Sequence, residues 1–187
     1  MIELIQSHGL EYAGIITALM GVFYSTQQHK IAWIWNFIAS CIYGILFYQV
    51  GLYSDMELQG VFMAMAIYGF VQWNKPSQWL EVTRSSWPHL FIGIAGSIIF
   101  GVTSGYLHQE LTHASLPFLD ATLTGLSIWG TYLAAKMKIE NWLVWILVNI
   151  IYVGIYFYKE MQGTAVLYII FLIFAFRGFY TWNKKLS

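Results

Sequence analysis

The sequence has little charge: charged residues make up 10% of its 187 positions, whereas a soluble domain usually carries about 25%. Nine basic and nine acidic residues give a formal net charge of zero, which excludes nucleic-acid binding through a basic surface. Hydrophobic residues make up 58% of the chain. They arrive in blocks of about 17 to 21 residues, the length that a helix needs to cross hydrocarbon. The chain is therefore predicted to be a polytopic membrane protein.

Several chemical motifs are also missing. One cysteine, Cys41, cannot form an internal disulfide or a cysteine-based metal site. The first ten residues hold no basic residue, so no cleavable signal peptide is expected and residues 1–10 are interpreted as a short polar lead-in. A phosphate-binding loop is absent, so the chain cannot hydrolyse ATP. No cofactor or metal site is predicted, because His108, Glu110 and His113 lack the spacing of ligands on one helix face.

Charged residues and Gly, Pro or Ser breaks separate the apolar blocks. The sequence predicts an all-α fold, a single membrane domain over 1–187 with seven transmembrane helices at about 10–27, 31–50, 57–74, 88–107, 118–136, 141–158 and 164–182. The fourth helix is rich in glycine, which suits close helix packing in lipid. Its glycines are Gly93, Gly96, Gly101 and Gly105.

Lysine and arginine are distributed unevenly between the two ends of these seven helices. Lys159 alone falls on the side of the N-terminus. The other side, with the C-terminus, collects Lys30, Lys75, Arg84, Lys136, Lys138, Arg177, Lys184 and Lys185. Because cytoplasmic loops are enriched in basic residues, the N-terminus is predicted outside and the C-terminus in the cytoplasm.

An internal repeat is visible when 11–75 is laid over 120–184 without gaps. The matches fall on uncommon residues, including Gly21 with Gly130, Trp33 with Trp142, Tyr43 with Tyr152, Gly69-Phe70 with Gly178-Phe179, and Trp73-Asn74-Lys75 with Trp182-Asn183-Lys184. Two three-helix copies in the same orientation require one inverting helix between them. The predicted architecture is 3+1+3, with repeats at 11–75 and 118–184 and a linker helix at 88–107, and such repeats place a substrate site between them near the midplane.

Two segments resemble a known family. The run Phe47-Tyr48-Gln49-Val50-Gly51-Leu52-Tyr53-Ser54-Asp55-Met56, with Leu58-Gln59 and 68–73, resembles the middle of the PnuC vitamin transporters. The run 138–149, with Asn149 followed by Tyr152, resembles their sixth helix. The resemblance implies a SWEET-like seven-helix fold and facilitated diffusion of a B-vitamin across the bacterial inner membrane. It also implies a cytoplasmic kinase that traps the vitamin by phosphorylation.

The predicted sixth helix carries the main candidate site. Trp142, Trp145, Asn149, Tyr152 and Tyr156 are spaced by three and four residues, so they share one face. Aromatic rings can stack on a flat heteroaromatic ligand, and the amide can hydrogen-bond it. An amide in mid-helix should face the protein interior, where it contacts either a ligand or a neighbouring helix.

Further candidates for substrate binding come from the repeat and from neighbouring helices: Asn36, Ser40, Tyr43, Gln59 and Tyr168. Four tryptophans have an alternative interpretation as an interfacial aromatic belt, because each is near a predicted membrane boundary: Trp33, Trp73, Trp142 and Trp182.

The resemblance implies a small cationic heteroaromatic vitamin, with nicotinamide riboside, the family's best-known substrate, ranked first. Thiamine, carried by close relatives, ranks second, and the larger, neutral riboflavin third. Tryptophan and tyrosine faces attract a ring cation by about 2 kcal/mol once water is excluded, so the aromatic content of 19% fits either of the first two. An intramembrane enzyme or accessory subunit is the other class considered. The predicted spans lack charged side chains in their middles, which disfavours both an enzyme and a proton-coupled or sodium-coupled pump. The sequence leaves the oligomeric state open.

Overall fold

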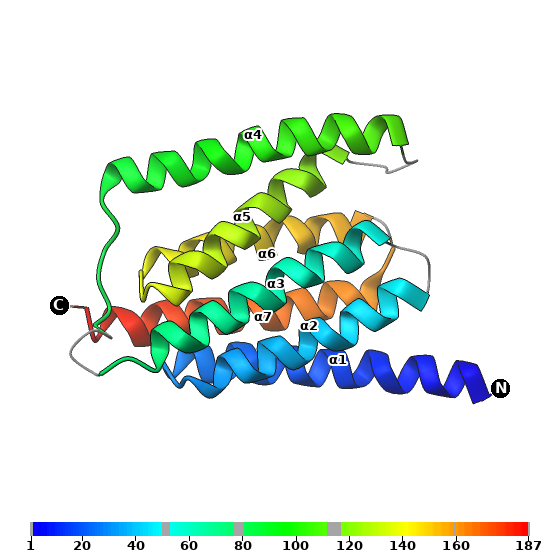
Figure 1. Cartoon of the computed structure of the whole chain (residues 1–187), viewed down its shortest axis with the longest axis horizontal. Coiled ribbons are helices and arrows are strands. Elements are labelled where there is room, and N and C mark those ends of the chain that lie inside the picture. The colour runs from blue at the N-terminus through cyan, green and yellow to red at the C-terminus, as the bar shows by residue number, and fades with distance from the viewer. Residues whose placement is uncertain (1, 50–52, 77–80, 112–116, 159, 187) are drawn as a thin grey trace. The chain divides into compact units, whose positions relative to one another are not determined.

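The computed structural model describes residues 2–49, 53–76, 81–111, 117–158 and 160–186. Figure 1 shows a chain built from helices, seven of them among these residues. They are α1 (Ile2–Thr26), α2 (Ile31–Gln49), α3 (Tyr53–Trp73), α4 (Trp87–Leu111), α5 (Pro117–Ala135), α6 (Glu140–Tyr158) and α7 (Gln162–Asn183).

Each of the seven helices overlaps one of the seven predicted segments, so the all-α prediction is confirmed. The prediction of a lead-in over 1–10 is wrong, because α1 begins at Ile2. Among the described residues, four helices are long and apolar enough to cross a bilayer by length and composition alone: α2, α4, α6 and α7. For α1, α3 and α5, membrane crossing stays a prediction.

The chain divides into two compact units, Met1–Leu80 and Glu81–Ser187. In unit 1, α2 packs against both α1 and α3. In unit 2, consecutive helices pack in pairs: α4 on α5, α5 on α6, and α6 on α7. Unit 2 therefore contains α4 together with the three helices of the second predicted repeat.

The turns after α1 and α5 have the same backbone geometry. Gln28 has a φ of 59° and Met137 a φ of 54°, and these positions differ by the repeat offset. In each turn the amide after the left-handed residue donates to a carbonyl five residues back, from His29 to Tyr24 at 3.1 Å and from Lys138 to Leu133 at 2.9 Å. This is the Schellman arrangement, which satisfies the last carbonyls of a helix.

A tryptophan packed on a glycine joins the last two helices of each unit. In unit 1 the Trp33 ring lies against Gly69 and meets Trp73 edge to face, with centroids 5.3 Å apart and planes at 88°. In unit 2 Trp142 lies against Gly178 and meets Trp182 at 5.4 Å and 90°. All four rings are at most 3% exposed. The structure therefore places them inside the helix packing and not in an aromatic belt at the surface.

Small residues of α4 form its contact with α5, as predicted from its glycines. The contacts are Gly93 with Trp129, Gly101 with Thr122, and Gly105 with Phe118. Gly96 lies outside this contact, because nothing lies within 4 Å of the position that a methyl group would take.

The close packing at Gly178 predicts a stability difference. In Gly178→Ala the new methyl group would lie 2.5 Å from ring atoms of Trp142, so we expect the free energy of unfolding to fall by about 1–3 kcal/mol. Gly154→Ala is the matched control, because its methyl group would meet nothing within 4 Å. The measurement is the apparent melting temperature of the purified protein in detergent. Equal melting temperatures for the two variants would contradict the packing argument.

Candidate functional site

One face of α6 carries the main candidate residues. Because α6 is continuous from Glu140 to Tyr158, the spacing places Trp142, Trp145, Asn149, Tyr152 and Tyr156 on this face. The face changes character along the helix. It begins with buried tryptophan, passes an amide and ends with tyrosines.

Asn149 is 4% exposed. Among the described residues no hydrogen bond of its carboxamide is found, and its two polar atoms are not among the fully enclosed side-chain atoms that lack a partner, so the amide keeps some access to its surroundings. The buried hydroxyl of Ser127 in the same unit behaves differently, since its Oγ donates to Leu123 O of its own helix at 2.8 Å. A buried amide normally finds a partner, because an unmade hydrogen bond costs about 1–3 kcal/mol. Asn149 thus retains its full hydrogen-bonding capacity.

Three tyrosines form a stacked cluster where α6 ends and α7 begins. Tyr152 and Tyr156 stack at 5.9 Å with planes at 22°. Tyr168 of α7 lies against both, 4.7 Å from Tyr152 and 5.1 Å from Tyr156 between ring centroids. Phe171 meets Tyr168 edge to face at 5.9 Å. The structure therefore brings the predicted Tyr168 to the predicted Tyr152, and it adds Phe171, which spacing within α6 could not indicate.

The two tryptophans of the face have packing roles. Trp142, 2% exposed, is enclosed by Gly178 and Trp182, and its indole N–H has no hydrogen-bond partner among the described residues. Trp145 is half-buried against the apolar cluster of α5 and α6, and its ring approaches Gly130. Asn149 and the tyrosines are therefore the residues of this face best suited to contact a ligand.

The corresponding face of α2 lies partly against α1. Asn36 Oδ1 packs on the backbone of Gly21, and the Tyr43 ring packs on Gly14. Tyr43 also stacks on Phe47, with centroids 6.1 Å apart and planes at 27°, as Tyr152 does on Tyr156. Ser40, which lies between Asn36 and Tyr43 in the sequence, is 7% exposed.

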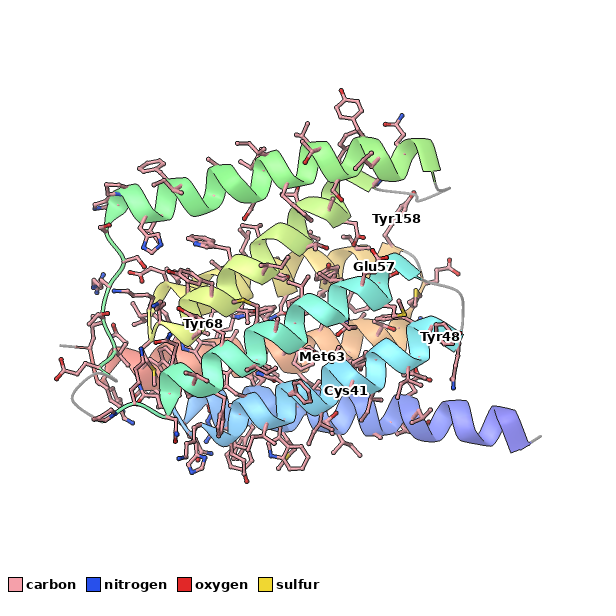
Figure 2. The ribbon with its side chains drawn as sticks, in the orientation of Figure 1. Cys41, Tyr48, Glu57, Met63, Tyr68 and Tyr158 are labelled. Carbon is pink, nitrogen blue, oxygen red and sulfur yellow. The ribbon has the colours of Figure 1, made fainter. Side chains whose placement is uncertain are left out.

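The last candidate, Gln59, lies at the contact between α2 and α3. Its Cβ lies 3.6 Å from the position that a methyl group would take on Gly44 of α2. Figure 2 shows the lone cysteine at the same helix pair, where Cys41 Sγ donates to Met63 Sδ at 3.4 Å. Gln59 and Cys41 are therefore residues of the α2–α3 packing.

The two units carry different chemistry at matched positions. At the repeat offset, Ser40 corresponds to Asn149, Asn36 to Trp145 and Gln59 to Tyr168. Unit 1 thus presents amides where unit 2 presents aromatic rings. Within the described part of the chain, no three His, Cys, Asp or Glu side chains come together as a metal site. The side chains of His108, Glu110 and His113 lie outside that part.

Comparisons with known proteins bear on the fold and the family of this chain. The nicotinamide riboside transporter PnuC of Escherichia coli (strain K12) is 25% identical over 201 residues, with 92% of this chain and 84% of that protein covered. The riboflavin/roseoflavin transporter RibM of Streptomyces davaonensis is 25% identical over 177 residues, with coverages of 90% and 80%. A crystal structure of the vitamin B3 transporter PnuC superposes with a TM-score of 0.73 at 18% identity, covering 94% of this chain and 80% of that one.

The crystal structure supports the fold, and the relatives support the family. A sequence model of the family described as nicotinamide mononucleotide transporter matches residues 8–184. Since this match spans all seven helices almost completely, the chain belongs to the nicotinamide mononucleotide transporter (PnuC) family.

Proposed function

We propose that this protein carries nicotinamide riboside across the bacterial inner membrane by facilitated diffusion. The observation that carries the proposal is Asn149, a residue 4% exposed whose carboxamide has no hydrogen-bond partner among the described residues, one turn before a stack of tyrosines on the same helix. Family membership gives the class of cargo, since relatives of this chain are transporters of nicotinamide riboside and of riboflavin.

The chemistry of this face suits a flat cation with a carboxamide. Aromatic faces attract a cation by about 2 kcal/mol when water is excluded, and Tyr152, Tyr156 and Tyr168 present three rings together. The free amide of Asn149 can both donate to and accept from a ligand carboxamide. Thiamine shares the ring cation and is the second candidate. Riboflavin, larger and neutral, is the third, and the similarity to a riboflavin transporter favours including it in every assay.

The positions of the charges support uniport. Within the predicted membrane spans the acidic residues lie toward the ends: Glu11, although inside α1, is at the start of the span predicted at 10–27, Asp120 is at the start of α5 and Glu140 is at the start of α6. Ion coupling generally uses carboxylates inside the membrane, so the substrate should equilibrate. A cytoplasmic kinase that phosphorylates the vitamin would then produce net uptake.

The proposal includes seven membrane spans in a 3+1+3 arrangement of parallel repeats, with the N-terminus outside and the C-terminus cytoplasmic. Matched turns at Gln28 and Met137 support the repeat. The matched tryptophan–glycine contacts at Gly69 and Gly178 support it independently. The distribution of lysine and arginine supports the orientation.

Replacement of Asn149 tests the ligand contact. Asn149→Leu removes the amide without removing bulk, and we expect initial uptake of nicotinamide riboside to fall about tenfold or more, because a ligand group would be left unpaired. Expression and melting temperature should be retained, since the amide makes no bond to the described protein. Ser127→Ala is the control for loss of a buried polar group in the same unit. Unchanged transport by Asn149→Leu would make Asn149 a packing residue.

Two substitutions at Tyr168 distinguish ring stacking on the substrate from hydrogen bonding by the tyrosine hydroxyl. Tyr168→Phe keeps the ring and should leave KM for nicotinamide riboside within about twofold, whereas Tyr168→Leu should raise it about tenfold through loss of cation–π attraction. The rise should be smaller for neutral riboflavin than for the two cations. If Phe and Leu variants bind all three vitamins alike, the tyrosine cluster does not contact the substrate.

Purified protein in liposomes tests the energetics. Without a kinase, free nicotinamide riboside should reach equal concentrations inside and outside under any imposed proton or sodium gradient. Enclosing a nicotinamide riboside kinase with ATP should raise total label without raising free substrate above the outside level. Gradient-driven accumulation of unmodified vitamin would contradict uniport and would direct attention to Asp120, Glu140 and Arg177.

A further inference from the structure

A short segment of unit 2 before α4 is bonded along its whole length to other parts of the same unit. Residues 82–85, which we call the strap, form parallel bridges from Val82 to Leu186 and from Thr83 to Lys138. Figure 1 shows this part of the chain passing beside the C-terminal end of α7 before α4 begins. The strap thus connects the turn between α5 and α6 with the residues that follow α7.

The hydrogen bonds of the strap engage both backbone and side chains. Thr83 N donates to Met137 O, and Ile139 N donates to Thr83 O, each at 3.1 Å. Ser85 N donates to Glu140 Oε2 at 3.0 Å. The lysine of the turn completes the set, since Lys138 Nζ donates to Thr83 Oγ1 at 2.9 Å and to Arg84 O at 3.2 Å.

Burial shows that the strap is part of the packing. Val82 is 2% exposed, as buried as Met137 at 4% and Ile139 at 3% in the turn that it contacts. A segment that detached during each cycle would have to expose these apolar side chains and break these five hydrogen bonds.

Unit 1 is built differently at the matching end. There Lys30 Nζ donates directly to Asn74 Oδ1 at 2.6 Å, so the turn after α1 is tied to the end of α3 by one side-chain bond. Across residues 2–49 and 53–76, no bridge comparable to those of the strap is found.

We propose that the strap is a permanent brace, in which Lys138 and Thr83 act as positioning residues for the ligand-contacting face of α6. Three helix ends meet at the strap: the end of α5, the start of α6 and the end of α7. Holding the start of α6 holds the rotation and height of Asn149 and Tyr152 further along it. Unit 2 then moves as one body during transport. This inference rests on the proposed function for its transport readout.

The bridged pair Thr83 and Lys138 offers a reversible test. Bridged strands lie about 4.8 Å apart, within the Cα separation that a disulfide spans. In a Cys41→Ser background, Thr83→Cys with Lys138→Cys removes both lysine bonds when reduced and restores the connection when oxidised. Arg84→Ala is the control, because it removes a strap charge while the bonded Arg84 O remains.

We expect the reduced double variant to show a KM for nicotinamide riboside raised about tenfold at nearly unchanged maximal rate, because a loosened face must be ordered on binding. Oxidation should return KM to that of the Cys41→Ser parent. For Arg84→Ala and for the two single cysteine variants, KM should be the same under reducing and oxidising conditions. Three results would overturn the brace. The double variant could transport when reduced and be blocked when oxidised, its KM could be equal in the two states, or its KM could fail to return to the parent's value on oxidation.

Melting temperature provides a readout that does not depend on the substrate. Oxidation of the double variant should raise the apparent melting temperature by about 3 °C or more, and absence of a rise would also contradict the brace. If the Cys41→Ser parent carries none of the three vitamins while this rise is observed, the proposed substrate fails and the brace stands as a structural element.

Discussion

The contact between a tryptophan ring and a glycine backbone sets the register of the paired helices in each unit. Helices in lipid gain little from the hydrophobic effect, so they associate through close van der Waals packing at small residues. Trp142 on Gly178 fixes α6 against α7 at one height. Tyr152 lies ten residues after Trp142, and Tyr168 lies ten residues before Gly178. In antiparallel helices both tyrosines therefore lie about 15 Å from that contact, on the same side of it, and they meet.

The same register has a different chemical outcome in unit 1. Trp33 on Gly69 sets α2 against α3, and the residues ten positions away are Tyr43 and Gln59. One scaffold thus carries a tyrosine and an amide in unit 1 at the positions where unit 2 carries Tyr152 and Tyr168. The strap adds a second constraint to unit 2 by fixing the start of α6. The α6 face is therefore held both by a packed ring and by a hydrogen-bonded segment.

Much of the fold could be predicted from the sequence, and for a physical reason. A helix in lipid must satisfy its own backbone, so hydrophobic length marks where the more apolar helices lie, here α2, α4, α6 and α7 among the described residues. The face shared by Asn149 and Tyr152 also follows from helical spacing. The predicted start of α1 at about residue 10 was wrong, because polar residues near a terminus do not by themselves end a helix. The burial of Trp142 was undecided, because a tryptophan near a helix end has the same local sequence whether it faces headgroups or a glycine.

The sequence by itself determined the seven helices, the distribution of basic residues, the membership of one family and the periodicity of the α6 face. These are local or compositional properties, and each can be read without knowing which helices touch. Tertiary structure decided which side chains meet. Tyr168 joined Tyr152, Asn149 was left without a hydrogen-bond partner among the described residues, and Thr83 reached Lys138 across 55 positions of the chain. Such contacts depend on the register between helices, which close packing at a few glycines sets and which local sequence does not encode.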